Sequence, residues 1–165
     1  MTNRITWAVL LAASAIAATA SPAMAQKTVT VVREIDTDRY DPHKSTSRSG
    51  AEVMYMIGDT MVNLDFDMKT LKPGLATSWT VSPDGLTYVF KLRDDVTFCS
   101  GKKFTADDVV YSFKRLTSPE LKAPLAWRAG ELKDIRAVDP YTVEYELKEP
   151  FSDLLLNLTM FTTAI

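Results

Sequence analysis

Hydrophobic and polar residues alternate most regularly at residues 86–93. Large apolar side chains occupy every second position there, namely Leu86, Tyr88, Phe90 and Leu92. A two-residue period with one apolar face predicts a strand that is half-buried against a core. The four residues before it, Ser82-Pro83-Asp84-Gly85, have the composition of a tight turn. We therefore expect this strand to pair back on the segment around Trp79.

The same alternation returns near the end of the chain. Residues 142–147 place Val143, Tyr145 and Leu147 opposite polar neighbours, and residues 134–138 before them are also strand-like. One apolar and one polar face are typical of an antiparallel sheet that is solvated on one side. We expect residues 142–147 to form an edge strand of such a sheet, and residues 153–161 to be helical.

Two further segments follow a helical period. Apolar or small residues at i, i+3, i+4, i+7, i+10 and i+11 predict a helix of about fourteen residues that begins near Ser49 and includes Val62. Methionines 54, 56 and 61 in this stretch indicate core packing, and the alternative is an adaptable binding surface. The other helix follows Thr105, whose spacing to Asp108 is that of a capping box. It should bury Val109, Phe113 and Leu116 and end before Pro119.

The first 25 residues read as a targeting segment. Arg4 is followed by an uncharged apolar run at 7–20, and Ala23-Met24-Ala25 places small residues before Gln26. This is the pattern of a cleavable secretory signal peptide, with a cut predicted between Ala25 and Gln26. A transmembrane anchor is the alternative, but the apolar run is short for the ~20 residues that a span needs. The product is expected to be exported and periplasmic.

Charge and reactive residues exclude several kinds of function. After removal of Arg4, 18 of the 19 basic side chains remain beside 21 acidic ones, and they form no basic patch for nucleic acid. His43 and Cys99 are the only residues of their types, so neither a disulfide nor a zinc site can form within the chain. Cys99 is interpreted as a buried or spectator thiol. We expect no catalytic residues, no metal and no cofactor.

The segment from Asp36 to Gly50 is polar throughout and follows a predicted short strand at residues 28–33. Pro42 disfavours a helical conformation for Asp41. A polar stretch of this length is either a flexible linker or a binding loop, and its composition does not separate the two.

Longer motifs then suggest a family. Residues 75–93 read L-A-x-S-W-x-V-S-P-D-G-L-T-Y-x-F-K-L-R, and residues 96–116 read V-T-F-x-S-G-x-x-F-T-A-D-D-V-V-Y-S-F-K-R-L. With D-P-H-K at 41–44 and V-D-P-Y-T-V-E-Y-E-L-K-E-P-F at 138–151, this pattern resembles the family 5 extracellular solute-binding proteins. The resemblance covers essentially all of the chain after residue 25.

The resemblance implies a mixed α/β fold of the type II periplasmic binding protein kind, with two lobes that close on a ligand. Residues 26–58 would supply the first strand, the binding loop and the start of a helix of the large lobe. Residues 59–165 would form an incomplete extra small mixed α/β domain. Because members of the family are much longer, we expect the N-terminal portion only, as a fragment or as a truncated gene product.

The resemblance also implies a function. Such a receptor would bind a di- or oligopeptide, or a similar small solute, and deliver it to the permease subunits of an ABC importer. Four residues match ligand-contacting positions of the family, namely Thr46, Ser47, Arg48 and Leu125. Trp127, two residues after Leu125, is the fifth candidate ligand residue. The receptor would act as a monomer and catalyse no reaction. The alternatives are a truncated remnant that does not bind, and an exported hydrolase that uses His43.

Overall fold

The computed structural model describes residues 30, 32, 36 and 39–165. The chain divides into two compact units, residues 1–34 and residues 35–165. All helices and strands among the described residues belong to the second unit. The predicted signal peptide lies outside the described residues, as do all but two residues of the predicted strand at 28–33.

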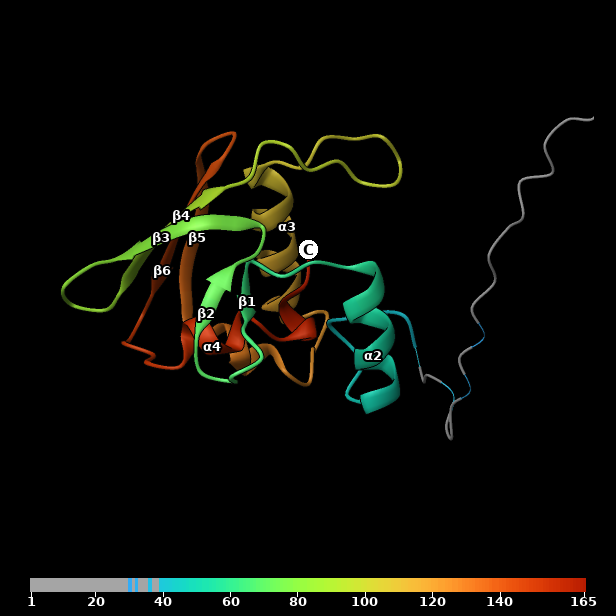
Figure 1. The fold of residues 1–165 in the computed structure, drawn as a ribbon. Helices are drawn as coiled ribbons and strands as arrows, with labels where there is room; N and C mark the ends of the chain where they lie inside the picture. Colours follow the sequence, from blue (N-terminus) through green and yellow to red (C-terminus); the bar gives the residue numbers. More distant parts are fainter. Residues whose placement is uncertain (1–29, 31, 33–35, 37–38) are drawn as a thin grey trace, which may run out of the picture. The chain divides into compact units, whose positions relative to one another are not determined.

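The second unit is built on a four-stranded antiparallel sheet with the strand order β3-β4-β6-β5 (Figure 1). The strands are β3 (Ala76–Val81), β4 (Thr87–Leu92), β5 (Leu132–Asp139) and β6 (Thr142–Leu147). Trp79 pairs with Phe90, which confirms the predicted hairpin. The prediction that residues 142–147 form an edge strand was wrong, because β6 pairs with β4 on one side and with β5 on the other. Its polar positions mark a solvated face of the sheet and not an edge.

Helix α3 (Ala106–Leu116) covers the apolar face of this sheet (Figure 1). The predicted core residues of the helix, Val109, Phe113 and Leu116, are all buried. The Phe113 ring meets the Tyr145 ring edge to face, with 5.3 Å between the ring centroids. The opposite face of the sheet carries ion pairs such as Lys133–Glu146, as expected for a solvated surface.

The start of α3 is fixed by the predicted capping box. The Thr105 amide donates to Asp108 Oδ2 at 3.0 Å, and both Asp107 and Asp108 lie in the first turn. Negative charge there stabilises the helix through the partial positive charge of its N-terminus. The two adjacent carboxylates therefore have a structural role.

Replacing Thr105 with alanine should lower the free energy of unfolding by about 1 kcal/mol, since a capping side chain is removed. Urea denaturation followed by circular dichroism measures this loss. Ser100→Ala, in the exposed turn before the helix, is the control and should change little. An equal loss in both variants would contradict the capping role.

The first described helix is shorter than the sequence predicts. Helix α2 spans Arg48–Ile57 and ends at Gly58, whose backbone is extended. The chain then enters a hairpin of β1 (Val62–Leu64) and β2 (Leu71–Pro73). Met61 and Val62 continue the apolar spacing past Gly58, but they belong to the extended segment that follows the helix, and their side chains are buried there. Met54 and Met61 are core residues as predicted, but Met56 is 69% exposed.

The rest of the unit consists of short helical turns, η2 (Ala126–Ala129), α4 (Leu154–Asn157) and η3 (Phe161–Thr163). The predicted helix at 153–161 thus forms only a single turn. The Thr159 hydroxyl donates to the Leu156 carbonyl at 2.7 Å, and such local bonds compete with helical ones.

Candidate functional site

The polar segment before α2 contains a hydrogen-bonded turn. The amides of Lys44 and Ser45 both donate to the Asp41 carbonyl, at 3.1 and 2.9 Å. The His43 amide donates to Asp41 Oδ1 at 3.1 Å. Residues 41–45 are therefore ordered by their own backbone, which favours the binding-loop interpretation over a flexible linker.

Arg115 on α3 holds this turn against the sheet domain. Its guanidinium donates to both Asp41 carboxylate oxygens, at 3.0 and 2.6 Å, and its Nη1 lies 2.7 Å from His43 Nδ1. Both partners of the ion pair are about 30% exposed, with 31% for Arg115 and 28% for Asp41. A bidentate arginine–carboxylate pair is geometrically specific as well as strong. The contact therefore fixes where the turn sits on α3.

The charges of this cluster shift its pKa values. The hydrogen bond from Arg115 holds the pKa of Asp41 below its ordinary value, and the same bond raises the pKa of Arg115. His43 is 4% exposed. Burial, followed by the nearby Arg115 charge, lowers the pKa of its imidazole. All three groups are thus in their ordinary neutral-pH states, with a neutral imidazole beside an ion pair.

Three predicted ligand residues continue directly from the turn. Ser47 is the N-cap of α2, and its Oγ accepts from the Gly50 amide at 3.0 Å. Thr46 is exposed. The Arg48 side chain is 95% exposed and lies 3.6 Å from Glu52 one turn along the helix. The structure therefore presents Thr46 and Arg48 at the surface, and it gives Ser47 a structural role that the sequence did not indicate.

The other two predicted residues belong to the turn around η2. Leu125 precedes η2 and is half-buried. Trp127 is 58% exposed, and its ring centroid is 4.9 Å from the Arg128 guanidinium carbon. Trp127 lines a shallow pocket of about 320 Å³ with Thr117, Ala126, Gly130, Glu131, Leu132 and Lys148. An exposed indole beside a pocket can stack on an apolar or aromatic ligand group.

The two sets of residues lie on different elements, but both meet the C-terminal end of α3. Arg115 holds the turn that leads into residues 46–48. Thr117, two residues later, lines the pocket of Trp127. Arg115 is the member of this candidate site that the sequence did not predict. The only signal was its place in the K-R-L end of the long motif.

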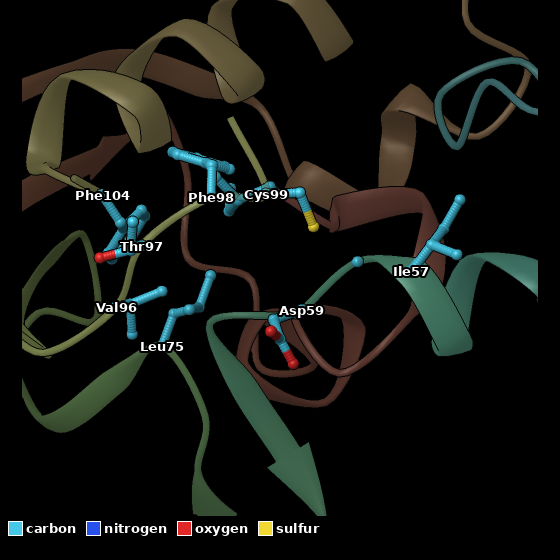
Figure 2. A pocket seen from close by; sticks show the side chains of 10 residues that line it. Ile57, Asp59, Leu75, Val96, Thr97, Phe98, Cys99 and Phe104 are labelled. Atoms are coloured by element: carbon cyan, nitrogen blue, oxygen red, sulfur yellow. The ribbon is translucent and has the colours of Figure 1, made fainter. Parts of the chain in front are cut away.

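A second, smaller pocket of about 140 Å³ lies between the end of α2 and the loop before α3 (Figure 2). It contains none of the predicted ligand residues. Figure 2 shows the Cys99 side chain pointing into the space between Phe98 and Ile57. Cys99 is exposed, so the buried alternative was wrong, while the interpretation as a spectator thiol stays a prediction. Among residues 30, 32, 36 and 39–165, no cluster of three or more metal-binding side chains occurs.

The described part of the chain contains no helix with the length and apolar character needed to cross a membrane.

Comparison with known proteins agrees with the fold and the motifs. The family described as "Bacterial extracellular solute-binding proteins, family 5 Middle" matches residues 70–165. The chain is 33% identical over 168 residues to di/tripeptide-binding protein 2 of Pseudomonas aeruginosa (strain UCBPP-PA14), covering 88% of this chain and 31% of that protein. It is 36% identical over 168 residues to the glutathione-binding protein GsiB of Salmonella typhimurium (strain LT2), covering 100% and 32%.

Solved structures show the same fold. The PBP AgaA from A. tumefacien R10, in complex with agropinic acid, superposes with a TM-score of 0.74 at 28% identity. The match covers 79% of this chain and 26% of that one. The predicted mixed α/β fold of periplasmic binding proteins is therefore confirmed, while its division at residue 58 stays a prediction. The chain spans about a third of the length of the curated relatives described above. It belongs to the bacterial extracellular solute-binding proteins of family 5.

Proposed function

We propose that this chain is part of the solute-binding component of an ABC importer, and that its ligands are di- or oligopeptides. The observation that carries the proposal is the exposed segment Thr46–Arg48, which Arg115 anchors to a rigid sheet domain through Asp41. In a family of solute-binding proteins, an exposed polar loop on a rigid scaffold is suited to ligand contact. Two of the relatives are named for di- and tripeptides and for glutathione, which are peptides or peptide-like.

The exposed groups fit a peptide in two ways. The Arg48 guanidinium can donate two parallel hydrogen bonds to a ligand carboxylate, and it lies in the first turn of α2. Trp127 can stack on an apolar or aromatic side chain of the ligand. Thr46 and Leu125 would add a hydroxyl and an apolar contact, and Ser47 would hold the start of α2. Closure of a second lobe would complete the cleft.

The proposal includes the wider setting of the receptor. A signal peptide cut between Ala25 and Gln26 would deliver the protein to the periplasm. There it would act as a monomer that passes its solute to the permease subunits in the inner membrane. Binding and release would be reversible, with no bond made or broken in the ligand.

Two other functions have less support. A hydrolase would need His43 as the base for a nucleophile, but His43 is 4% exposed and its Nδ1 already faces Arg115 at 2.7 Å. The other alternative is a truncated remnant that does not bind ligand. It differs from the receptor only in lacking a complete binding cleft. Binding measurements therefore separate these two.

A chimera tests the proposal. Residues 26–165 of this chain would replace the matching residues of GsiB, whose remaining part supplies the rest of a binding protein. We expect the chimera to bind glutathione, and Arg48→Ala to weaken binding by about 10- to 100-fold, as expected for loss of a hydrogen bond to a charged group. Isothermal titration calorimetry measures both.

The isolated chain should bind glutathione and di- to pentapeptides with a Kd of about 1 mM or weaker, because one side of a cleft contributes few contacts.

Arg136→Ala is the matched control, since Arg136 lies on the solvated sheet face and pairs there with Glu144. It should leave glutathione binding unchanged. A folded chimera that does not bind, or equal losses for the Arg48 and Arg136 variants, would contradict the proposed site. Micromolar binding by the isolated chain would show that it needs no second lobe.

A further inference from the structure

His43 is held in one tautomer by its neighbours. Arg115 can only donate, so His43 Nδ1 must accept its hydrogen bond and carry no proton. In a neutral imidazole the proton then resides on Nε2. This nitrogen is buried and, within the described residues, has no partner in good hydrogen-bond geometry. The Ala164 backbone interacts with the ring and favours its protonated form.

The ring of His43 lies beside both members of an ion pair. From its own turn it faces the Asp41 carboxylate, and from α3 it faces Arg115, with Tyr111 close to that guanidinium. From the C-terminal segment, the backbone of Ala164 interacts with the ring. Asp41 is already engaged through both oxygens by Arg115. Protonation of His43 would thus remove the acceptor at Nδ1, while both Asp41 oxygens already accept hydrogen bonds from Arg115.

The turn that contains His43 is packed tightly against the start of α2. Ser45 is fully buried, and a Cβ added to Gly50 would lie 2.2 Å from Ser45 Oγ. Ser45 Oγ also lies 3.4 Å from Ser47 Oγ. A shift of the turn therefore moves the segment Thr46–Arg48, which follows Ser45 directly.

We propose that Arg115 is a positioning residue that, with neutral His43, clamps residues 41–45 onto α3, and that protonation of His43 opens this clamp. Protonated Nδ1 becomes a donor and faces the donor Nη1 of Arg115 at 2.7 Å, which turns an attractive contact into a repulsive one. Acid thus loosens Thr46–Arg48. The link to ligand affinity rests on the proposed function, but the clamp itself does not.

The pH range follows from the direction of the shifts. His43 has a lowered pKa in the folded chain, so the unfolded chain binds more protons below about the ordinary value of 6.5. Stability is full above that pH and falls as the pH drops toward the lower folded value. Asp41 has a pKa below its ordinary 3.8, so its contribution is lost only in stronger acid. As the pH falls, the loss at His43 therefore begins before the loss at Asp41.

NMR on the 165-residue chain tests the clamp without any ligand. Because His43 is the only histidine, its ring nitrogens are assigned directly, and we expect the Nε2–H form at pH 7.5. Backbone order parameters of residues 44–48 should be near 0.85 at pH 7.5 and should fall below about 0.6 at the acidic pH where the ring nitrogens report a protonated His43. His43→Asn, whose amide oxygen can accept at the position of Nδ1 but does not titrate, should stay rigid at both pH values. Arg115→Lys, which cannot form the same fork, should be loose at both.

Three results would overturn the clamp. These are a ring proton on Nδ1 at pH 7.5, the same pH profile in the wild type and in His43→Asn, or a rigid loop in Arg115→Lys. The ring measurement needs no variant, so it decides even if a variant fails to fold. A working clamp in a chimera that binds no glutathione would leave this inference standing and sink the proposed function.

Discussion

Replacing Phe113 with alanine is expected to lower the free energy of unfolding by about 3–5 kcal/mol. Phe113 is 2% exposed and lies at the centre of the interface between α3 and the sheet. Its truncation removes apolar contacts and leaves a cavity next to Tyr145, whose ring it meets at 5.3 Å. Urea denaturation of the purified chain, followed by far-ultraviolet circular dichroism, measures the loss. So large a fraction of a typical domain's stability would leave the variant close to unfolding.

Tyr111→Ala is the control on the same helix. Tyr111 is 69% exposed, so its truncation also removes an aromatic ring but opens no cavity. A change within about 0.5 kcal/mol is expected for such a surface position. If the two variants lost the same stability, α3 would not be the helix that closes this core.

Local patterns predicted the elements of the sheet well. Alternation at residues 86–93 and 142–147 is decided by which face of a strand is buried, and a strand shows this face in every second residue. The apolar residues of α3 and its capping box are similarly local, with partners three or four positions away. These features therefore follow from short stretches of sequence.

The order of the strands and the C-terminal end of α2 could not be predicted in the same way. A strand with one apolar and one polar face has the same sequence pattern at the edge and in the centre of a sheet. For this reason β6 was wrongly predicted to be an edge strand. In α2, Gly58 stops the helix while the apolar spacing continues into Met61 and Val62. Periodicity reports burial of side chains, and burial can come from a helix or from the extended chain that follows it.

In the candidate site, too, the local features could be predicted and the long-range contact could not. The exposed positions of Thr46, Arg48 and Trp127 agree with surface contacts, but the anchor of the loop depends on a pair of residues 74 positions apart, Asp41 and Arg115. No local pattern joins residues at that separation. The long motifs contain both ends of the contact, in D-P-H-K and in F-K-R-L, without showing that they meet.

This contact also explains why so much of the motif is structural. A ligand loop gains affinity when it is held in its binding conformation before the ligand arrives, since less ordering is then needed on binding. In the proposed receptor, α3 would supply Arg115 for this purpose. The capping box and Phe113 hold α3 itself on the sheet. A stretch without reactive groups can therefore support binding through rigidity alone.

Gly74→Ala is expected to lower the free energy of unfolding by about 3 kcal/mol, through overpacking and the loss of hydrogen bonds. A Cβ at this position would lie 2.4 Å from the Thr60 carbonyl oxygen and 3.0 Å from that of Met61. Both atoms belong to the main chain, so they cannot rotate away as a side chain would. The same carbonyls accept from Leu75 and Ala76 at 2.9 Å, and moving them weakens both bonds. Urea denaturation measures the loss.

Gly101→Ala is the matched comparison. It separates two reasons for which a position can require glycine, a positive φ and a lack of space for a Cβ. Gly101 has φ of +85° with open space where a Cβ would lie, so alanine there meets only the backbone strain of about 1–2 kcal/mol. Gly74 has no such positive φ, and its requirement is space. We therefore expect the larger loss at Gly74, and a larger loss at Gly101 would show that the backbone of residues 60–61 can yield. A yielding backbone there would also remove the constraint that places the β1–β2 hairpin beside the start of β3.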